Sequence, residues 1–429
     1  MIVNLAFGRS GLEIAVPDDA SIVAPVFLPG LEDETAAIRQ SLRQPIASPA
    51  LRDLLDPSAT VAIVFSDITR PVPNRLLLPP ILVEIEEAGV PTSSVTLINA
   101  CGMHRPNTPD ELDAMLGPKI TATYRIVNHD ARDSNQLAYI GKSSFGREVW
   151  VNKNYLQASV RILTGFIEPH FFAGFSGGAK SVLPGIAGSQ TIMRNHNAAM
   201  VGHPQARWGV TDENPIFSES RQAEAMAPCS FVVNVALNER RRITGVFAGG
   251  LKAAHDAGIA FVRKTAMRSV HNEFDIVVTT NSGYPLDLNL YQAVKGMSAA
   301  AEIVRPGGDI IIASECSEGV GHGNFAAMLG LRSSPREMLD LIESPGFLMF
   351  DQWEAQILAK ILLKSRVHIF ATGLSQQEAR AAFLQPWDSV ERAILTLAGQ
   401  HKERSGRDPR ICILPQGPQT VPYVAYATG

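Results

Sequence analysis

The stretch PHFFAGFSGGAKSVLPGIAG, residues 169–188, places glycines, a lysine and a histidine in an order that suggests anion binding. A nucleotide-binding P-loop has a glycine, four variable residues and then Gly-Lys-Ser or Gly-Lys-Thr. Here Gly174 is followed by four residues and then by Ala-Lys-Ser, so one required glycine is replaced. Apart from Asp67, no aspartate at the end of a neighbouring strand is suited to hold magnesium. ATP hydrolysis is therefore not favoured.

The same stretch has the groups for a different anion site. Ser176, Gly177 and Gly178 can turn backbone amides toward a phosphate, and Lys180 can add a positive charge or a nucleophilic amine. His196 follows on an expected helix, in TIMRNHNAAM. Imidazole suits nickel, zinc, copper or iron, but a single histidine is a poor metal site. A metal bound here would need most of its ligands from outside the protein.

Polar side chains also follow three apolar strands of the expected first domain. Asp67 and Arg70 stand in SDITRPVP, His104 in GMHRP and His170 in IEPH. Ligands of open parallel sheets bind at the carboxyl ends of the strands, where these residues would meet. Each alone has a structural explanation, since an aspartate caps turns and a lone histidine is more often a hydrogen-bonded structural residue. Their shared position makes a common site the better hypothesis.

The chemistry of such a site would be acid–base catalysis on an anionic substrate. Two histidines suit proton transfer because their unperturbed pKa lies near neutrality, and on opposite faces of one carbon they could serve either enantiomer. The forked donors of Arg70 suit a carboxylate or a developing oxyanion.

A second group of candidates lies in the C-terminal part of the chain. In NSGYPLDLNLYQAVKGMSAA, residues 281–300, Tyr291 and Lys295 share a helix face, with Gln292 beside them. A solvated amphipathic helix would explain the spacing, yet Lys295 stands among small and apolar residues. Trp353, in FDQWEAQ, is on its own more typical of a core than of a site.

The elements that must position these groups indicate an α/β fold. Continuous Val- and Ile-rich strands such as TVAIVFSD and FDIVVTTNSG alternate with helical patterns, which predicts largely parallel sheets covered on both faces. We place a domain boundary after residue 270, giving an N-terminal domain over 1–270 and a C-terminal domain over 271–409. The last segment, 410–429, is expected to return to the first domain.

Composition excludes several classes of protein. The chain has 429 residues, 45% of them hydrophobic, which is enough for two or three domains. Its net charge of −4 gives no electrostatic case for nucleic acid or an anionic membrane. The four cysteines form no CxxC pair, and no apolar run approaches the length of a membrane span. We expect a soluble, cytoplasmic protein with reduced cysteines.

Together these stretches resemble the nickel-dependent lactate racemase family. The similarity runs through nearly the whole chain, in SDITRPVP, GMHRP, EPHFFAGFSGGAKSVLPGIAG, TIMRNH, GYPLDLNLYQAVKGM and DQWEAQ. The resemblance implies two α/β domains with the active site in the cleft between them.

The resemblance also implies a cofactor, the nickel-pincer nucleotide, built from a nicotinic acid precursor by dedicated enzymes. Two sulfurs and one ring carbon of that nucleotide bind nickel, and His196 matches the position of the protein ligand. Lys180 matches the lysine that can carry the nucleotide through a thioamide linkage, and Ser176, Gly177 and Gly178 would hold its phosphate. The partners implied are the cofactor-building enzymes and a small 2-hydroxy acid.

The implied reaction inverts C2 of a 2-hydroxy acid by hydride transfer. One of His104 and His170 takes the hydroxyl proton while hydride leaves C2, and the second histidine or the same one returns the proton. This route avoids the carbanion that direct deprotonation would form. By position the substrate is held by Arg70, Gln292 and Lys295, with Asp67 supporting, Tyr291 flanking and Trp353 on the wall.

The substrate itself stays open at this stage. Lactate or another short 2-hydroxy acid is the first choice, and malate-, aryl- or sugar-acid-like substrates are alternatives. Arg75 could bind a second carboxylate, but a surface residue at the start of a helix is the better interpretation. The alternative of another class is a protein that binds the nickel nucleotide or a hydroxy acid without catalysis, although binding alone requires neither histidine. The oligomeric state cannot be read from the sequence.

Overall fold

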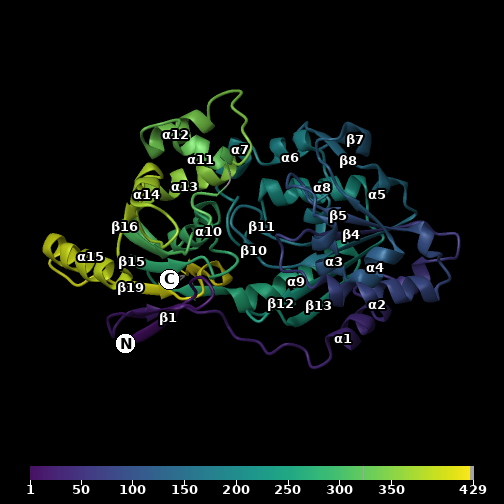
Figure 1. Cartoon of the computed structure of the whole chain (residues 1–429), viewed down its shortest axis with the longest axis horizontal. Helices are drawn as coiled ribbons and strands as arrows, with labels where there is room; N and C mark the ends of the chain where they lie inside the picture. The colour runs from purple at the N-terminus through teal and green to yellow at the C-terminus, as the bar shows by residue number, and fades with distance from the viewer. Residues whose placement is uncertain (322, 426–429) are drawn as a thin grey trace. The chain divides into compact units, whose positions relative to one another are not determined.

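The computed structural model describes residues 1–321 and 323–425, and the chain forms two compact units, each built from separate segments. The central unit comprises Phe27–His196 and Gln205–Arg263. The terminal unit comprises Met1–Val26, Asn197–Pro204 and Lys264–Gly429. Each unit has its own six-stranded sheet, whose labelled strands can be followed in Figure 1.

The sheet of the central unit has the strand order β13-β12-β9-β4-β5-β6. All neighbours are parallel except β12 and β13, which form an antiparallel pair at one edge. The strands are β4 (Val61–Ser66), β5 (Val95–Ala100), β6 (Arg125–Asn128), β9 (Val160–Phe166), β12 (Phe231–Leu237) and β13 (Ile243–Gly249). Strands β9, β4 and β5 are consecutive, so their carboxyl ends open at the same edge, as the sequence predicted.

Both faces of this sheet are buried, because alternate side chains of each strand point to opposite sides. In β4, Ile63 and Phe65 join one core, whereas Ala62 and Val64 join the other. The helices of this unit are α1 (Glu34–Arg43), α2 (Asn74–Glu87), α3 (Pro109–Leu116), α4 (Pro118–Thr123), α5 (Lys153–Gln157), α6 (Ser189–Asn195), α8 (Pro215–Met226) and most of α9 (Leu251–Ala266). A hairpin of β7 (Leu137–Lys142) and β8 (Glu148–Asn152) completes it.

The sheet of the terminal unit is parallel throughout, in the order β18-β17-β16-β15-β19-β3. Its strands are β3 (Ser21–Ile22), β15 (Phe274–Thr280), β16 (Val304–Ala313), β17 (Arg366–Phe370), β18 (Gln385–Pro386) and β19 (Ile411–Leu414). Helix α10 (Leu290–Ala301) connects β15 to β16, and α13 (Gln352–Lys364) precedes β17. Both helices pack on the sheet and on each other.

The opposite face of this sheet is covered by α15 (Val390–Ser405) and by the hairpin of β1 (Ile2–Leu5) and β2 (Leu12–Ala15). The remaining elements of the unit are α7 (Ala198–Gly202), α11 (Gly323–Leu329), α12 (Pro335–Ile342), α14 (Gln376–Ala381) and the pair β14 (Met267–Val270) and β20 (Val421–Val424). Within residues 1–321 and 323–425, no helix has the length and apolarity needed to cross a membrane.

The domain expectation needs correction in three places, one of which is that Asn197–Pro204 belongs to the terminal unit. The described part of the last segment, 410–425, does not return to the first domain, because β19 pairs with β15 through Ile276 and Ile411 in the terminal sheet. The first 26 residues also belong to the terminal unit, where β3 pairs with β19. A short apolar strand such as ICIL fits the interior of either sheet, so its own residues do not reveal which one it joins. The main boundary lies at Arg263 and Lys264, close to the predicted one.

Candidate active site

Asp67 and His104 follow the neighbouring strands β4 and β5, and the structure brings them into direct contact. His104 Nδ1 lies 2.8 Å from Asp67 Oδ2, and the Thr69 hydroxyl donates to the other carboxylate oxygen at 2.7 Å. Asp67 is buried, at 3% exposure, whereas the His104 side chain is 40% exposed. Burial alone would raise the pKa of Asp67, but the bonds from His104 and Thr69 and the charge of Arg70 lower it overall.

Hydrogen bonds of two asparagines, Asn99 and Asn107, hold the turns that carry this pair. Asn99 in β5 donates to Asn107 Oδ1 at 2.8 Å, and the backbone amide of Ile68 bonds to the same oxygen at 3.4 Å. Asn107 in turn donates to Glu111 at the start of α3. Asn107 therefore links the turn of Asp67 to the turn of His104.

His170 stands in a small hairpin that follows β9. The hairpin joins β10 (Pro169–His170) to β11 (Gly174–Phe175), with His170 opposite Gly174. The ring stacks on Phe171 with centroids 4.9 Å apart, and the backbone amide of Ala173 donates to His170 Nδ1 at 3.3 Å. With 7% of its surface exposed, His170 is far more buried than His104.

Three candidate residues meet around the ring of Phe172. His170 lies edge-on with centroids 4.6 Å apart, His196 lies edge-on at 5.1 Å, and Lys180 Nζ lies 5.8 Å from the ring centroid. Lys180 is on the short 3-10 helix Gly178–Ser181, which packs over β9 and β4. The structure therefore gathers one proposed base, the attachment lysine and the proposed metal ligand in the central unit.

His196 ends helix α6 and is buried, at 6% exposure. Burial, with the nearby charge of Lys180 added, lowers its pKa to about 3, so the imidazole is neutral at pH 7. A neutral imidazole with a lone pair is the form that binds a metal. Among the described residues, no group of three or more His, Cys, Asp or Glu side chains is arranged to hold a metal ion. A metal at His196 must therefore bring other ligands with it.

The glycine-rich loop is organised differently from the expectation that its amides face an anion. The amide of Gly178 donates to Asn234 Oδ1 at 2.8 Å, and the amide of Ser176 donates to the Glu168 carbonyl at 2.9 Å. The Ser176 hydroxyl donates to the Phe166 carbonyl at 3.0 Å. These bonds tie the amides of Ser176 and Gly178 to the end of β9 and to β12.

A residue that sequence reasoning missed, His255 of α9, fixes the same loop. Its Nε2 lies 2.9 Å from the Ser176 carbonyl, and a Cβ added to Gly178 would lie 2.3 Å from its Nδ1. Gly178 also has a φ of +54°, which favours glycine. Burial, reinforced by the charge of Arg221, lowers the pKa of His255 to about 4. Nothing in the sequence around His255 distinguishes it from an ordinary helix residue.

The four candidates of the terminal unit are also brought together. On α10, the Lys295 ammonium donates to Gln292 Oε1 at 2.6 Å. Between α10 and α13, the Trp353 indole donates to the Tyr291 hydroxyl at 3.2 Å. Tyr291 and Trp353 are each 8% exposed. Gly296 lets α10 lie close to β15, because a Cβ at this position would lie 2.1 Å from the Thr280 carbonyl of β15.

Two buried carboxyl groups, missed by sequence reasoning, adjoin this group. Asp351 and Glu354, at the start of α13, are each 1% exposed. Burial, with the charge of Asp351 added, raises the pKa of Glu354 to about 8, although the Lys295 ammonium opposes the shift. Burial and these two carboxyl groups also raise the pKa of Tyr291. The sequence signal was available in DQWEAQ, which places two acids beside Trp353.

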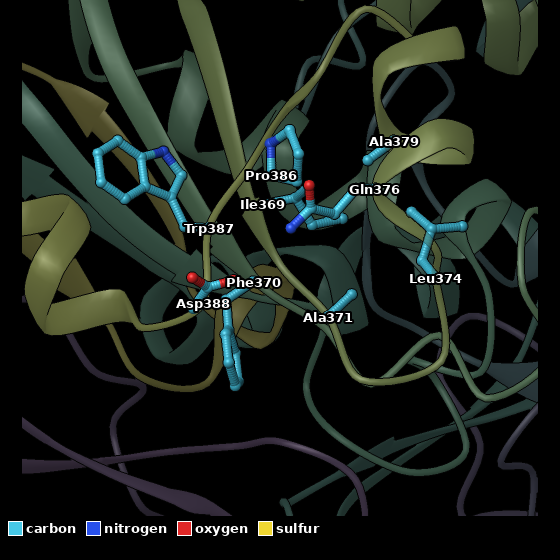
Figure 2. Close-up of a pocket in the computed structure, with 9 residues that line it drawn as sticks. All are labelled: Ile369, Phe370, Ala371, Leu374, Gln376, Ala379, Pro386, Trp387 and Asp388. Carbon is cyan, nitrogen blue, oxygen red and sulfur yellow. The ribbon is translucent and has the colours of Figure 1, made fainter.

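A separate pocket of about 240 Å³ lies in the terminal unit at the carboxyl ends of β17 and β18 (Figure 2). Trp387 and Asp388 line one side of it, and Leu374 and Gln376 line another. None of the candidate site residues lines this pocket, and no basic side chain is among its lining residues. It therefore does not suit the carboxylate of a 2-hydroxy acid.

Comparison with known proteins agrees with this geometry. A family model described as the lactate racemase N-terminal domain matches residues 7–209, and one described as the lactate racemase C-terminal domain matches residues 270–421. The chain is 35% identical to the lactate racemase of Thermoanaerobacterium thermosaccharolyticum over 97% of both chains. It is 40% identical to the lactate racemase of Lactiplantibacillus plantarum over 80% of both chains.

Solved structures give the same result. The lactate racemase apoprotein from Thermoanaerobacterium thermosaccharolyticum superposes with a TM-score of 0.91, at 34% identity, covering 98% of this chain and all of that one. A protein from Thermotoga maritima superposes with a TM-score of 0.69 at 20% identity over 93% of this chain, which shows a shared fold. The fold and the relatives define an isomerase of the racemase class. The chain belongs to the lactate racemase family.

Proposed function

We propose that the protein racemises lactate or a related short 2-hydroxy acid by proton-coupled hydride transfer, with a nickel-pincer nucleotide as its cofactor. The observation that carries the proposal is the Asp67–His104 pair. A buried carboxylate holding a half-exposed imidazole at 2.8 Å is the arrangement of a general base and the group that orients it. A protein that only bound the acid would need a cation and would not need this pair.

The protein's own groups divide the work. One of His104 and His170 takes the proton of the substrate hydroxyl, and the second histidine or the same one returns it. Arg70 and Lys295 bind the carboxylate as cations, and Gln292, which already accepts from Lys295, orients that ammonium. Tyr291 and Trp353 form an apolar wall that excludes water, with Asp67 supporting His104.

The residues present fit the proposed cofactor. His196 is neutral and in ligand form, and the ammonium of Lys180 lies near the same Phe172 ring that His196 meets edge-on. Since the described residues supply no conventional metal cluster, a nucleotide that brings most of its own nickel ligands suits the site better than a bare ion. When bound, it supplies the acceptor for the hydride that leaves C2.

A short substrate is favoured over a dicarboxylic one. Arg75, the one residue considered as a second carboxylate binder, is exposed in the first turn of α2, where its guanidinium lies near Gly117. This supports the interpretation of Arg75 as a surface residue, so lactate remains the first substrate to test.

The proposal is tested on protein made together with the cofactor-building enzymes, using a chiral assay on a panel of 2-hydroxy acids and nickel analysis. We expect interconversion of the two lactate enantiomers and about one nickel per chain, roughly the stoichiometry of a single-site cofactor. Bound nickel without turnover of any acid would support the non-catalytic alternative. Protein made without those enzymes should be inactive and serves as the blank.

The roles of His196 and Lys180 are tested separately. His196→Ala should lose most of its nickel on desalting while remaining folded, and His271→Ala, an exposed histidine of the terminal unit, is the matched control. Full nickel in His196→Ala would remove that residue from the site. Intact-mass analysis should place any covalent adduct on Lys180, and an adduct elsewhere would contradict the assignment.

A further inference from the structure

Glu219, on helix α8, is a buried carboxyl group outside the candidate site, with 2% of its surface exposed. Its Oε1 accepts from the Ser143 hydroxyl at 2.7 Å. Its Oε2 accepts from the Asn195 side-chain amide at 2.9 Å and from the Arg147 guanidinium at 3.1 Å. Taking a carboxyl group out of water costs free energy that well-formed hydrogen bonds must offset. The three donors therefore explain how the protein accommodates Glu219 at this position.

The donors to Glu219 come from two other elements of the central unit. Ser143 and Arg147 belong to the turn of the β7–β8 hairpin, which is closed by a bond of 2.9 Å from the Ser143 amide to the Arg147 carbonyl. Asn195 is the last residue of helix α6. Glu219 thus joins α8 both to the hairpin and to the C-terminal end of α6.

The bond to Asn195 holds the residue that directly precedes His196. Asn195 is completely buried, and within the described residues its side-chain carbonyl has no hydrogen-bond partner, so the bond to Glu219 is what fixes the amide group. Helix α6 has seven residues, too few to be stable without tertiary contacts. Near its start, the Thr191 hydroxyl donates to the Glu148 carbonyl at 3.2 Å. At its end, Asn195 ties the helix to α8.

His196 needs an anchor of this kind, because the chain leaves the central unit directly after it. The next residues, Asn197–Pro204, belong to the terminal unit. The His196 amide still donates to the Ile192 carbonyl at 2.9 Å, but its own backbone, with φ −100° and ψ +23°, is no longer helical. The last turn of a helix lacks partners for its carbonyl groups and frays readily. The bond from Asn195 to Glu219 opposes that fraying.

We propose, on the basis of the proposed function, that Glu219 is a positioning residue for the nickel ligand His196. Through Asn195 it holds the end of α6, so that the imidazole keeps its place edge-on to the Phe172 ring before the cofactor binds. Removing a residue that orients a metal ligand typically lowers metal affinity roughly 10–100-fold. Glu219 acts through α6 and takes no part in proton transfer.

Two alanine variants separate positioning from general stability. Asn195→Ala and Ser143→Ala each remove one donor to the same carboxyl group, but Ser143 lies on the hairpin and not on α6. Both are loaded with the cofactor and desalted at a temperature at which thermal unfolding shows them to be folded. We expect Asn195→Ala to lose nickel roughly 10-fold faster than the wild type and Ser143→Ala to retain it. Equal nickel retention in the two variants would overturn the proposal.

Two variants at position 219 test the carboxyl group itself. Glu219→Gln keeps an oxygen that can accept from Asn195, and the Ser143 hydroxyl can turn to accept from the new amide group, so nickel should be retained. Glu219→Met keeps the length of the side chain without such an acceptor and should lose nickel as Asn195→Ala does. Equal retention in these two variants would show that Glu219 is not the anchor. If Glu219→Met does not fold, the comparison of Asn195→Ala with Ser143→Ala decides.

The apoprotein gives a readout that needs no nickel. NMR spectra of protein labelled on histidine report the environment of each ring, and His196→Ala assigns the His196 signal. Asn195→Ala and Glu219→Met should shift or broaden that signal, whereas Ser143→Ala should leave it unchanged. An unchanged His196 signal in Asn195→Ala would contradict the positioning role. If the wild-type protein takes up no nickel, the proposed function fails, and the NMR comparison still decides whether Glu219 positions His196.

Discussion

In the central unit the two candidate histidines, His104 and His170, follow the strands β5 and β9, whereas in the terminal unit the candidate residues stand on the two packed helices α10 and α13. His104 Nδ1 bonds to the Asp67 carboxylate, and His170 Nδ1 accepts from the backbone amide of Ala173. Trp353 of α13 donates to Tyr291 of α10, and Lys295 donates to Gln292 on α10 itself. A turn can present one chosen atom of a ring, and a pair of helices gives a rigid wall that excludes water. In the proposed function, the proton-transfer groups therefore stand after strands, whereas Lys295, Tyr291 and Trp353 stand on packed helices.

The largest effect on turnover is expected from a change in the central unit, at His104. His104→Ala removes the proposed base, so turnover should fall roughly 10²–10⁴-fold while KM changes little. Steady-state racemisation by the loaded variant measures both constants, with His271→Ala as the control. A variant that keeps near wild-type turnover would show that the Asp67–His104 pair is structural.

The loop that carries Lys180 should be the next most sensitive. Gly178→Ala combines a positive φ with a Cβ 2.3 Å from His255, whereas Gly307→Ala has a positive φ with nothing within 4 Å. We expect Gly178→Ala to lower the free energy of unfolding by about 2–4 kcal/mol, and Gly307→Ala by about 1–2 kcal/mol. Thermal unfolding of the two apoproteins provides the comparison. Equal losses would mean that the His255 contact does not constrain the loop.

A change at Lys295, on α10 of the terminal unit, should have a smaller effect on catalysis and should act mainly through KM. Lys295→Met keeps the length of the side chain but removes the charged donor, which should lower kcat/KM about 10–100-fold, mainly through KM. Lys402→Met, on the exposed part of α15, is the matched control. A loss confined to turnover, with KM unchanged, would place Lys295 among the groups that act in the transition state alone.

The smallest effect concerns the buried carboxyl group beside Lys295. The pKa of Glu354 is raised to about 8 from its usual value of 4.5, so the folded protein retains a proton that the unfolded chain releases between these pH values. Its contribution to stability is complete below pH 4.5 and is lost as the pH rises toward 8. Glu354→Gln should therefore flatten the decline in stability of the apoprotein between pH 6 and about 8.5.

Denaturant unfolding at several pH values measures this slope. Glu337→Gln is the control, because Glu337 is exposed and its pKa is lowered, so it does not titrate in this range. An unchanged slope in Glu354→Gln would show that Glu354 is ionised in the folded protein.

Sequence reasoning succeeded where local pattern decides the outcome. Continuous apolar strands followed by Asp67 and His104 predicted both the parallel sheet and the edge where these residues meet, and their contact confirms that part. It failed where distant segments decide the outcome. The membership of β19 in the terminal sheet depends on its pairing with β15 and β3, and ICIL alone does not encode either contact.

The individual hydrogen bonds of the candidate site could also not be predicted from the sequence. The contact of His170 Nδ1 depends on the direction of one backbone amide, that of Ala173, in a short hairpin. The amides of Ser176 and Gly178 looked available for an anion, but Asn234 and the Glu168 carbonyl take them. Side chains with no local motif, such as His255, become visible only when α9 is packed against the loop.

The pairing of β3 with β19 has a consequence for how the chain is made. During synthesis β3 emerges early, but its partner β19 emerges near the end. The central unit has all six strands of its sheet once β13 is made, so it can fold while the ribosome is still producing the rest. The growing chain can therefore reach a stage in which the strands that carry His104 and His170 are already paired, while β3 has no strand to pair with until β19 is made.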